Sequence, residues 1–189
     1  MKGPLIILSG PSGSGKSKVI SGVLKENGRI HLAVSATTRD KRKGEQDGVH
    51  YFFWERTKFE EEIKAGAFLE YFEVVGNYYG TLRSQVDPYR ERGLGVLLEI
   101  DVQEAAEIRK QYPEAVSVFL KTSTFDEYER RLRSRGTENE EQIRRRLAKG
   151  RLEEQRIGEF DHVVVNDDLE TAVAEFKAII ARAFTGGHT

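Results

Sequence analysis

Eight consecutive residues near the N-terminus fit the phosphate-binding pattern G-x-x-x-x-G-K-[S/T] at every fixed position: Gly10, Pro11, Ser12, Gly13, Ser14, Gly15, Lys16 and Ser17. Because glycine carries no Cβ, the backbone N–H groups of such a loop can converge on an anion. Lys16 would add a point charge to the outer phosphates, and the Ser17 hydroxyl would bind Mg²⁺. A glycine-rich turn that only joins a strand to a helix is the alternative, but the complete pattern favours a phosphate site.

The flanking segments support this interpretation. An apolar run, Leu5–Ser9, precedes the loop and predicts a buried strand, and a helical pattern follows over 16–25. The positive N-terminal end of that helix would point at the bound phosphate. The loop therefore has the strand and the helix that a phosphate-binding loop requires.

A metal at this loop needs an acidic group at the end of a neighbouring strand. The apolar run over 96–101 ends in two carboxylates, Glu99 and Asp101, which strand alternation would place on the same side. Both are candidates to lie near the Mg²⁺ without binding it directly. Acids at a strand end are also often simply solvated, and this alternative stays open for both residues.

The rest of the chain alternates between short β-rich runs and helical patterns. We expect further strands at 31–35, 95–100, 115–120 and 162–165, and helices at 102–111 and 169–184. In the last helix Val173, Phe176, Ile180 and Phe184 share one face. This order predicts an α/β fold in which helices flank a parallel sheet.

Two segments depart from that order. Residues 36–82 are rich in Gly, Arg and aromatic residues, and they predict a small, mostly antiparallel subdomain with one helix near 57–65. Residues 125–157 predict a highly charged helical hairpin with its turn near Gly136 and Thr137. We expect one domain with a core of 1–35, 83–124 and 158–189. Pro88 fixes a helix boundary within 83–93 only loosely.

Composition narrows the function classes. The 189 residues include 30 Lys and Arg, 31 Asp and Glu and no Cys, which gives a net charge of −1. This balance argues against binding of nucleic acid or of membranes by bulk charge, and it excludes disulfides and thiolate metal sites. The first apolar run is too short for a signal peptide, and no run approaches the about 18 residues of a membrane span. We expect a cytoplasmic protein.

Several motifs after the loop resemble guanylate kinases, in family order and over nearly the whole chain: 35–45, 48–52, 68–70, 76–81, 100–103, 135–137 and 165–169. The resemblance implies a P-loop kinase core with an inserted nucleotide-acceptor subdomain, 36–82, and a helical lid, 125–157. It also implies transfer of a phosphoryl group from ATP to GMP, giving ADP and GDP, with Mg²⁺ as cofactor. dGMP is a further possible acceptor, and the oligomeric state stays open.

A monophosphate kinase must also hold the phosphate of its acceptor. Arg39 and Arg42 lie three residues apart in a glycine-bounded loop and can bind a phosphate as a planar fork. Solvated surface charge is the alternative for two such arginines taken alone. The resemblance adds the hydroxyl groups of Tyr51 and Tyr79 to this site.

Guanine presents two adjacent donors, N1–H and N2–H₂, which a single carboxylate can accept together. The resemblance assigns that role to Glu70, and it assigns the neighbouring hydroxyl positions to Ser35 and Thr81. Asp101 is a further candidate for the same edge of the base. An isolated glutamate in a strand is usually only a solvated residue, so the assignment of Glu70 depends on the resemblance.

The charged hairpin allows two interpretations. It could be an exposed, ion-paired pair of helices, because glutamates alternate with the arginines. It could instead be a lid whose arginines neutralise the charge of the triphosphate, and the resemblance favours this role for Arg131, Arg135 and Arg146. Asn166 matches a family position near the adenine of ATP.

The expected reaction is an in-line transfer without a covalent intermediate. In it, Lys16, the lid arginines and Mg²⁺ stabilise charge, while Arg39 and Arg42 align the acceptor. Closure of the subdomain and of the lid would exclude water. One departure from the family is Glu104, which stands where a glycine is usual. The alternatives are a non-catalytic interaction domain, which typically has a degraded phosphate loop, and a kinase for AMP or a ribose phosphate.

Overall fold

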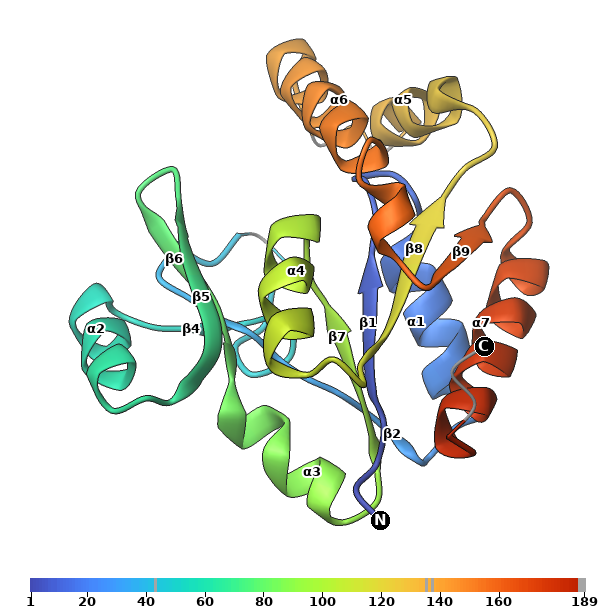
Figure 1. Ribbon diagram of the computed structural model, residues 1–189. Coiled ribbons are helices and arrows are strands. Elements are labelled where there is room, and N and C mark those ends of the chain that lie inside the picture. Colours follow the sequence, from blue (N-terminus) through green and yellow to red (C-terminus); the bar gives the residue numbers. More distant parts are fainter. Residues whose placement is uncertain (43, 135, 137, 187–189) are drawn as a thin grey trace.

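The computed structural model of the protein describes residues 1–42, 44–134, 136 and 138–186. Its central layer is a five-stranded parallel sheet in the order β2-β7-β1-β8-β9 (Figure 1). These strands are β1 Leu5–Ser9, β2 Ile30–Leu32, β7 Gly95–Glu99, β8 Val116–Lys121 and β9 His162–Val165. β1 lies in the middle and is buried along its whole length, which explains its uninterrupted apolar sequence. The expected parallel sheet is confirmed.

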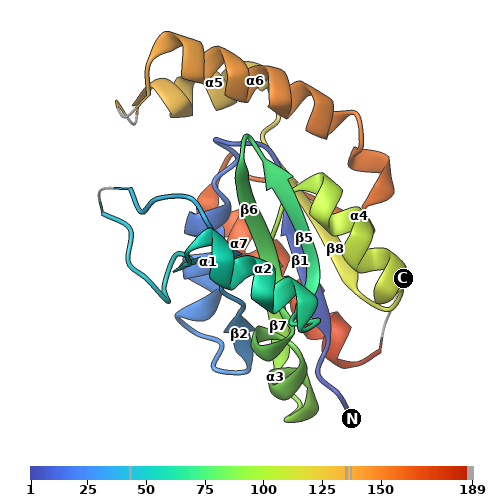
Figure 2. The same ribbon diagram turned by 90° about the vertical axis from the view of Figure 1, so that its left-hand side faces the viewer.

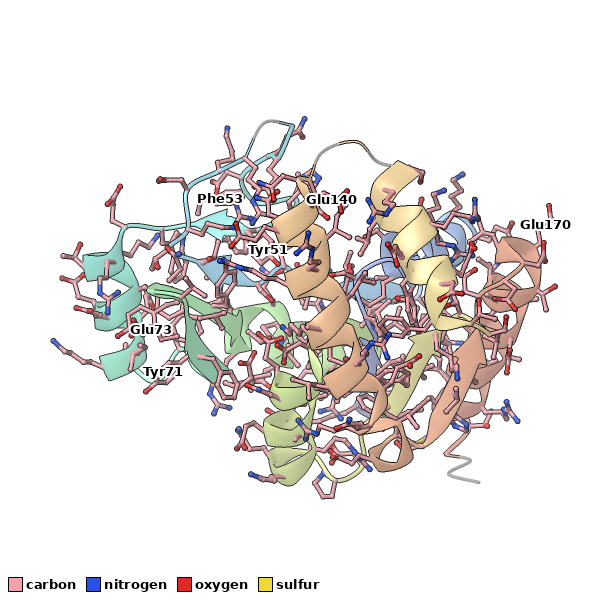
Figure 3. All side chains as sticks on the ribbon, turned by 90° about the horizontal axis from the view of Figure 1, so that it is seen from above. Tyr51, Phe53, Tyr71, Glu73, Glu140 and Glu170 are labelled. Atoms are coloured by element: carbon pink, nitrogen blue, oxygen red, sulfur yellow. The ribbon has the colours of Figure 1, made fainter. Side chains whose placement is uncertain are left out.

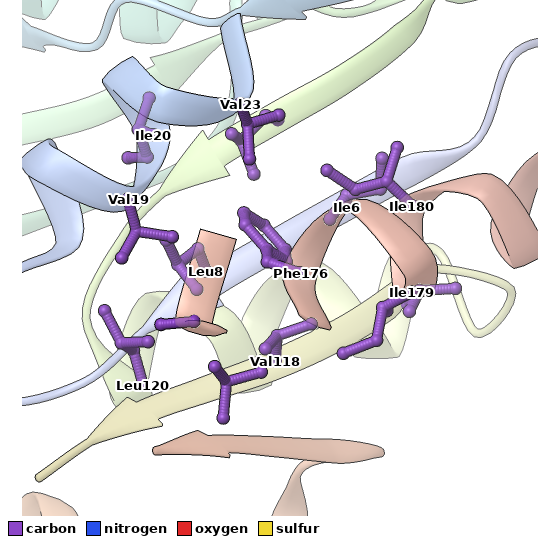
Figure 4. Close-up of a cluster of buried hydrophobic side chains, with 14 of the residues drawn as sticks. Ile6, Leu8, Val19, Ile20, Val23, Val118, Leu120, Phe176, Ile179 and Ile180 are labelled. Carbon is purple, nitrogen blue, oxygen red and sulfur yellow. The ribbon is translucent and has the colours of Figure 1, made fainter. Parts of the chain in front are cut away.

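Helices cover both faces of this sheet. On one face lie α1, Lys16–Leu24, and α7, Leu169–Phe184; on the other lie α3, Asp87–Glu91, and α4, Val102–Gln111. Phe176 of α7 is fully buried between α1 and the sheet, among Leu8, Val19 and Val118 (Figure 4). The apolar stripe predicted for this last helix therefore forms part of the core.

A second sheet forms the predicted acceptor subdomain. Its order is β4-β3-β6-β5, with the two longer strands joined by a tight hairpin. The elements are β3 Ala36–Thr37, β4 Phe52–Phe53, α2 Arg56–Lys64, β5 Phe68–Val74 and β6 Asn77–Leu82. Only the β3·β4 pair is parallel, so the expectation of a mostly antiparallel unit is confirmed. Stacked aromatic rings, with Phe59 and Phe68 centroids 4.4 Å apart, give the unit its own small core.

The charged segment forms two helices, α5 Phe125–Ser134 and α6 Glu140–Glu154. The side chain of Asn139 caps α6 by accepting from the backbone N–H of Gln142, 2.9 Å away. Figure 2 shows the pair lying across the core, above the end of β1 from which the phosphate loop leaves. Arg135 and Thr137, at the predicted turn, lie outside the described residues.

Some element boundaries differ from the sequence-based expectation. The strand expected at 31–35 is β2 and ends at Leu32, and the strand expected at 95–100 ends at Glu99. Pro88 is the second residue of α3, where its missing N–H costs no helical hydrogen bond. Two short 3₁₀ helices are also present, Arg83–Gln85 before α3 and Ile157–Glu159 before β9.

Within the described residues, no helix is both long enough and apolar enough to cross a membrane.

Candidate active site

The loop between β1 and α1 has the geometry of a phosphate cradle. Gly10 has a φ of 143° and Gly15 a φ of 93°, values that side-chain-bearing residues rarely adopt. A Cβ on Gly10 would lie 2.1 Å from the carbonyl oxygen of Leu120, and one on Gly15 would lie 2.3 Å from Nδ2 of Asn166. The loop can therefore pass this close to its neighbours only with glycine at both positions. α1 begins immediately afterwards, so its first N–H groups have no helical partner and can bind an anion.

A cleft of about 590 Å³ opens beside this loop. Its walls include most of the residues predicted to bind ATP, together with Glu99 and Arg131: Pro11, Ser12, Gly13, Gly15, Lys16, Ser17 and Asn166. The other two predicted residues, Gly10 and Ser14, are buried within the loop itself. The volume is within the range of pockets that hold a nucleotide-sized ligand.

Lys16 and Ser17 are the two polar side chains at the head of α1. The Lys16 ammonium donates to the carbonyl oxygen of Gly10 at 2.6 Å, which holds the charge over the loop. Ser17 and Glu99 both line the cleft. The surrounding protein desolvates the Glu99 carboxyl group and raises its pKa, while the nearby positive charge of Lys16 acts in the opposite direction.

The described residues contain no group of three or more His, Cys, Asp or Glu side chains that could hold a metal by themselves. Mg²⁺ suits such a site, because it commonly keeps several waters and is bound by one or two protein groups and by substrate phosphates. One hydroxyl, from Ser17, and one nearby carboxylate, from Glu99, fit that requirement.

Asn166 and Arg131 join the lid to the loop. Nδ2 of Asn166, just after β9, donates to the carbonyl oxygen of Ser14 at 2.6 Å. The Arg131 guanidinium donates to the carbonyl oxygen of Asn166 at 2.8 Å, while its Nε donates to Glu127 at 2.6 Å. Arg131 is thus pinned at the mouth of the cleft, on an extended network that includes the loop backbone.

The remaining lid arginines separate into two groups. Arg146 of α6 donates to the Ser12 hydroxyl at 3.0 Å and also pairs with Glu138. By contrast, exposed arginines of the hairpin pair with glutamates on the surface: Arg130 with Glu127, Arg133 with Glu129 and Glu140, and Arg145 with Glu141. Surface ion pairing thus accounts for these exposed arginines, whereas Arg131 and Arg146 also contact Asn166 and Ser12 at the cleft. Arg135 lies outside the described residues.

The acceptor subdomain carries a second cationic site. Arg39 is largely buried, and its guanidinium lies 5.6 Å from the ring centres of both Tyr51 and Phe53. The Tyr79 ring lies beside Tyr51, with centroids 6.1 Å apart. Burial raises the pKa of Tyr51 to about 12, so it stays a neutral hydroxyl donor. The Arg42 side chain is exposed and is not part of this cluster.

Glu70 lies in a buried pocket of the same subdomain and is 6% exposed. Its Oε1 accepts from the backbone N–H of Thr81 at 3.0 Å, on the neighbouring strand β6. Its Oε2 and the Thr81 hydroxyl are both buried without a hydrogen bond of normal geometry, although the Thr81 side chain lies close enough to favour the charged form of Glu70. Burial raises the pKa of Glu70 to about 7. Ser35 precedes β3, and its carbonyl oxygen accepts from Phe52.

Asp101 lies past the end of β7 and is the N-cap of α4. Its Oδ1 accepts from the backbone N–H groups of Gln103 and Glu104, at 2.9 and 3.1 Å. Because β7 ends at Glu99, Asp101 is a helix cap and not a strand residue, so strand alternation does not determine on which side its side chain lies. Glu99 lines the cleft at the phosphate loop, whereas Asp101 is absent from the described walls of that cleft.

Comparison with known proteins decides the family. The guanylate kinase family profile matches residues 2–183. The guanylate kinase of Vibrio vulnificus (strain YJ016) is 48% identical over 181 residues, covering 95% of this chain and 87% of its own. This chain belongs to the guanylate kinase family. The guanylate kinase of Prochlorococcus marinus (strain MIT 9313) is 45% identical over 179 residues, covering 95% of each chain.

A solved structure agrees with the sequence comparison. The crystal structure of the guanylate kinase from Anaplasma phagocytophilum superposes with a TM-score of 0.76 at 31% identity, covering 95% of this chain and 85% of the other. The predicted P-loop kinase fold is thereby confirmed for this member of the guanylate kinase family.

Three side chains of this guanylate kinase family member contact the site and were not identified as site residues from the sequence. Glu45 binds Arg39, Glu104 completes the cap with Asp101, and Lys149 of α6 donates to Asp101 at 3.0 Å. Glu45 could have been suspected, because it is the nearest acid after two arginines in one loop. Lys149 gave no signal, since its partner lies 48 residues away in the sequence.

Proposed function

We propose that this chain transfers the terminal phosphoryl group of ATP to GMP, giving ADP and GDP. The observation that carries the choice of GMP is the buried, unpartnered Oε2 of Glu70 beside the unpartnered Thr81 hydroxyl. Buried polar atoms without partners are rare in native proteins, so these two need a partner, and a base that donates two hydrogen bonds would supply one. Guanine supplies two adjacent N–H donors for such a carboxylate, whereas adenine presents an acceptor at the corresponding ring nitrogen.

Each part of the fold has its own proposed role in binding the two nucleotides. The core, 1–35, 83–124 and 158–189, would hold ATP; the subdomain 36–82 would hold GMP; and the hairpin 125–157 would act as the lid. Arg39 would bind the acceptor phosphate with Tyr51 and Tyr79, and Arg42 would join them by reorienting from solvent. Ser35 and Asp101 would contact the guanine edge with Glu70 and Thr81.

In the reaction an oxygen of the GMP phosphate attacks the γ-phosphorus of ATP while the bond to the bridging oxygen of ADP breaks. The attacking oxygen is already ionised near neutral pH, so no general base is needed. Lys16, Arg131 and Arg146, with Arg135, would stabilise charge on the transferred group. Asn166 would lie near the adenine, as the family resemblance implies.

Mg²⁺ is the cofactor that the donor set fits. The Ser17 hydroxyl would bind it, and Glu99 would hold one of its waters; Asp101 stays a weaker candidate because it is engaged elsewhere. When bound, the ion would neutralise charge on the β- and γ-phosphates. dGMP as a second acceptor and a cytoplasmic location remain predictions.

Two alternatives are less well supported. A non-catalytic interaction domain would have no need for a complete phosphate loop, for the glycines at its positive-φ positions or for a lid arginine at the cleft. A kinase for AMP would leave Glu70 opposite a ring nitrogen that donates no proton.

The direct test is a coupled assay of ADP release with GMP, AMP, UMP and CMP as acceptors, with Mg²⁺ present. We expect a kcat/KM for GMP at least about 100-fold above that for AMP, because buried acceptors left unpaired reject the wrong base strongly. Comparable rates with AMP would contradict the assignment of the base, and ADP release without any acceptor dependence would contradict a monophosphate kinase.

A further inference from the structure

One side of α6 contacts both halves of the site. Arg146 and Lys149 are three residues apart and therefore lie on the same side of the helix. Arg146 donates to the Ser12 hydroxyl in the phosphate loop, and Lys149 donates to Oδ2 of Asp101, each at 3.0 Å. Seen from above, α6 passes between the acceptor subdomain, which carries Tyr51, and α5 (Figure 3). The helix thus contacts the core at two points: the phosphate loop and Asp101, which is the residue proposed to contact the guanine edge.

The next residue along the helix fixes this position. A Cβ on Gly150 would lie 3.2 Å from Cβ of Pro11, which means that α6 packs tightly on the phosphate loop at this point. The contact between Lys149 and Asp101 therefore lies next to the point where α6 packs against the core. A movement of the distal part of the lid would pivot near this contact.

Asp101 is held on three sides. Two backbone N–H groups of α4 bind Oδ1, and Lys149 binds Oδ2. The backbone N–H of Asp101 in turn donates to Oε2 of Glu104 at 2.6 Å, and this completes a reciprocal cap. Rotation of the Asp101 carboxylate would break either the cap hydrogen bonds to Oδ1 or the hydrogen bond from Lys149 to Oδ2. Lys149 therefore helps to fix the orientation of Oδ2.

Lys149 also has an acceptor within its own helix. Its ammonium lies 3.6 Å from the carboxylate of Glu153, whose side chain is 8% exposed. The ammonium therefore lies between a carboxylate of the lid and a carboxylate at the head of α4. Both negative charges favour keeping the cation between them, and this links the position of α6 to that of Asp101.

We propose that Lys149 is a positioning residue that couples the lid to the acceptor site. This inference rests on the proposed role of Asp101 at the guanine edge. A guanine that contacts Asp101 favours the orientation in which Oδ2 faces Lys149, and Lys149 then holds α6 where Arg146 reaches the phosphate loop. By reciprocity, an ATP-bound lid favours the Asp101 orientation that receives guanine.

A purely structural role predicts something different. The Lys149 side chain is 56% exposed, and exposed ion pairs contribute little to stability. If the pair served only the fold, its loss would change the melting temperature slightly and leave the binding of the two nucleotides as coupled as before. The test must therefore measure coupling rather than stability.

The experiment compares the dissociation constant of GMP with and without Mg²⁺ and adenylyl imidodiphosphate, a non-hydrolysable ATP analogue, by titration calorimetry. The proteins are wild type, Lys149→Ala, Lys149→Arg and Arg145→Ala. Arg145 is the matched control, because it lies on the same helix in an exposed pair with Glu141. A wild-type coupling factor of about 5-fold or more is expected.

Lys149→Ala should bring that factor close to 1, whereas Lys149→Arg should keep most of it and Arg145→Ala all of it. A wild type without coupling, an unchanged factor in Lys149→Ala, or an equal loss in Arg145→Ala would each overturn the inference. Phosphoryl transfer by the wild type is measured separately. Its absence with GMP would contradict the proposed function, whereas normal transfer with unchanged coupling in Lys149→Ala would contradict only the role of Lys149.

Discussion

Glu45 binds the guanidinium of Arg39 with both of its carboxylate oxygens. Nη1 of Arg39 donates to Oε2 at 2.9 Å, and Nη2 donates to Oε1 at 2.8 Å. The Arg39 side chain is 13% exposed and that of Glu45 is 17% exposed. The same Oε2 accepts from the backbone N–H of Arg42 at 2.7 Å. These hydrogen bonds hold the pKa of Glu45 at about 2. Nε of Arg39 is buried without a hydrogen-bond partner, so the ion pair fixes the arginine but does not use all of its donors.

Removal of this anchor should weaken GMP binding. In Glu45→Ala the Arg39 side chain loses a two-point ion pair, and hydrogen bonds to charged groups contribute about 1.5–3 kcal/mol. We expect the KM for GMP to rise about 10-fold or more, with little change in the KM for ATP. Steady-state kinetics with each nucleotide varied in turn gives both values. A lower KM for GMP would show instead that Glu45 competes with the phosphate for Arg39.

Loss of the loop charge should affect turnover rather than folding. In Lys16→Ala the ammonium over the loop is absent, and removal of one preorganised charge at a reacting group costs about 10²–10³ in kcat. The circular dichroism spectrum should not change, because the buried core does not include this side chain. A folded variant with near-normal turnover would contradict an ATP-dependent phosphoryl transfer at this loop.

The lid arginines should differ sharply in importance. Arg131→Ala removes a guanidinium that contacts the backbone of Asn166 at the cleft, and kcat should fall about 100-fold or more. Arg133→Ala on the same helix removes only exposed pairs with Glu129 and Glu140, so its kcat should stay within about twofold. Equal losses in both variants would mean that the hairpin acts through its overall charge.

The sequence was most informative where local pattern decides structure. The phosphate loop and the core helices follow from spacing alone, because the apolar period and the glycine positions determine the local conformation. The chemistry of Glu70 came only from the resemblance to a family. A buried carboxylate with one free oxygen depends on two strands pairing across a hairpin, and spacing does not show that.

Other features needed the tertiary structure. Which arginines of the lid reach the loop depends on how two helices cross the core, so residue spacing alone could not separate Arg131 and Arg146 from Arg133. Only the family resemblance distinguished them in the sequence. The cap at Asp101 is different, since an acid followed three residues later by glutamate is a known helix-start signature. That signal was present in the sequence, and it explains why a glutamate is tolerated at 104.

Base specificity should depend on Glu70. Glu70→Gln keeps the shape but replaces one acceptor with a donor, so that one guanine N–H faces an amide N–H. We expect kcat/KM for GMP to fall about 5- to 150-fold, from a loss of roughly 1–3 kcal/mol. Discrimination against AMP should shrink, because a side-chain amide can match the donor and acceptor of adenine. The KM for ATP is the control, and equal losses for GMP and AMP would indicate a role in folding or closure.

Burial of Glu104 should make stability fall as the pH rises. Burial, with Glu70 and Asp101 nearby, raises the pKa of Glu104 to about 8 in the folded state. An unfolded glutamate has a pKa near 4.3, so between these values the folded state binds more protons, and its stability decreases with rising pH. Glu104→Gln can still accept from the backbone of Asp101, but it has no proton to lose.

We therefore expect Glu104→Gln to match the wild type near pH 5 and to exceed it increasingly up to pH 8, by about 1–3 kcal/mol in the free energy of unfolding. For a chain of this length that corresponds to a melting temperature higher by several degrees, at about 2–4 °C per kcal/mol. Glu107→Gln, at an exposed acid of the same helix, is the matched control and should show no such trend. Melting curves in urea or by temperature at pH 5, 6, 7 and 8 make the comparison. A stability difference that is the same at every pH would mean that Glu104 is charged in the folded protein and that another group stabilises its carboxylate.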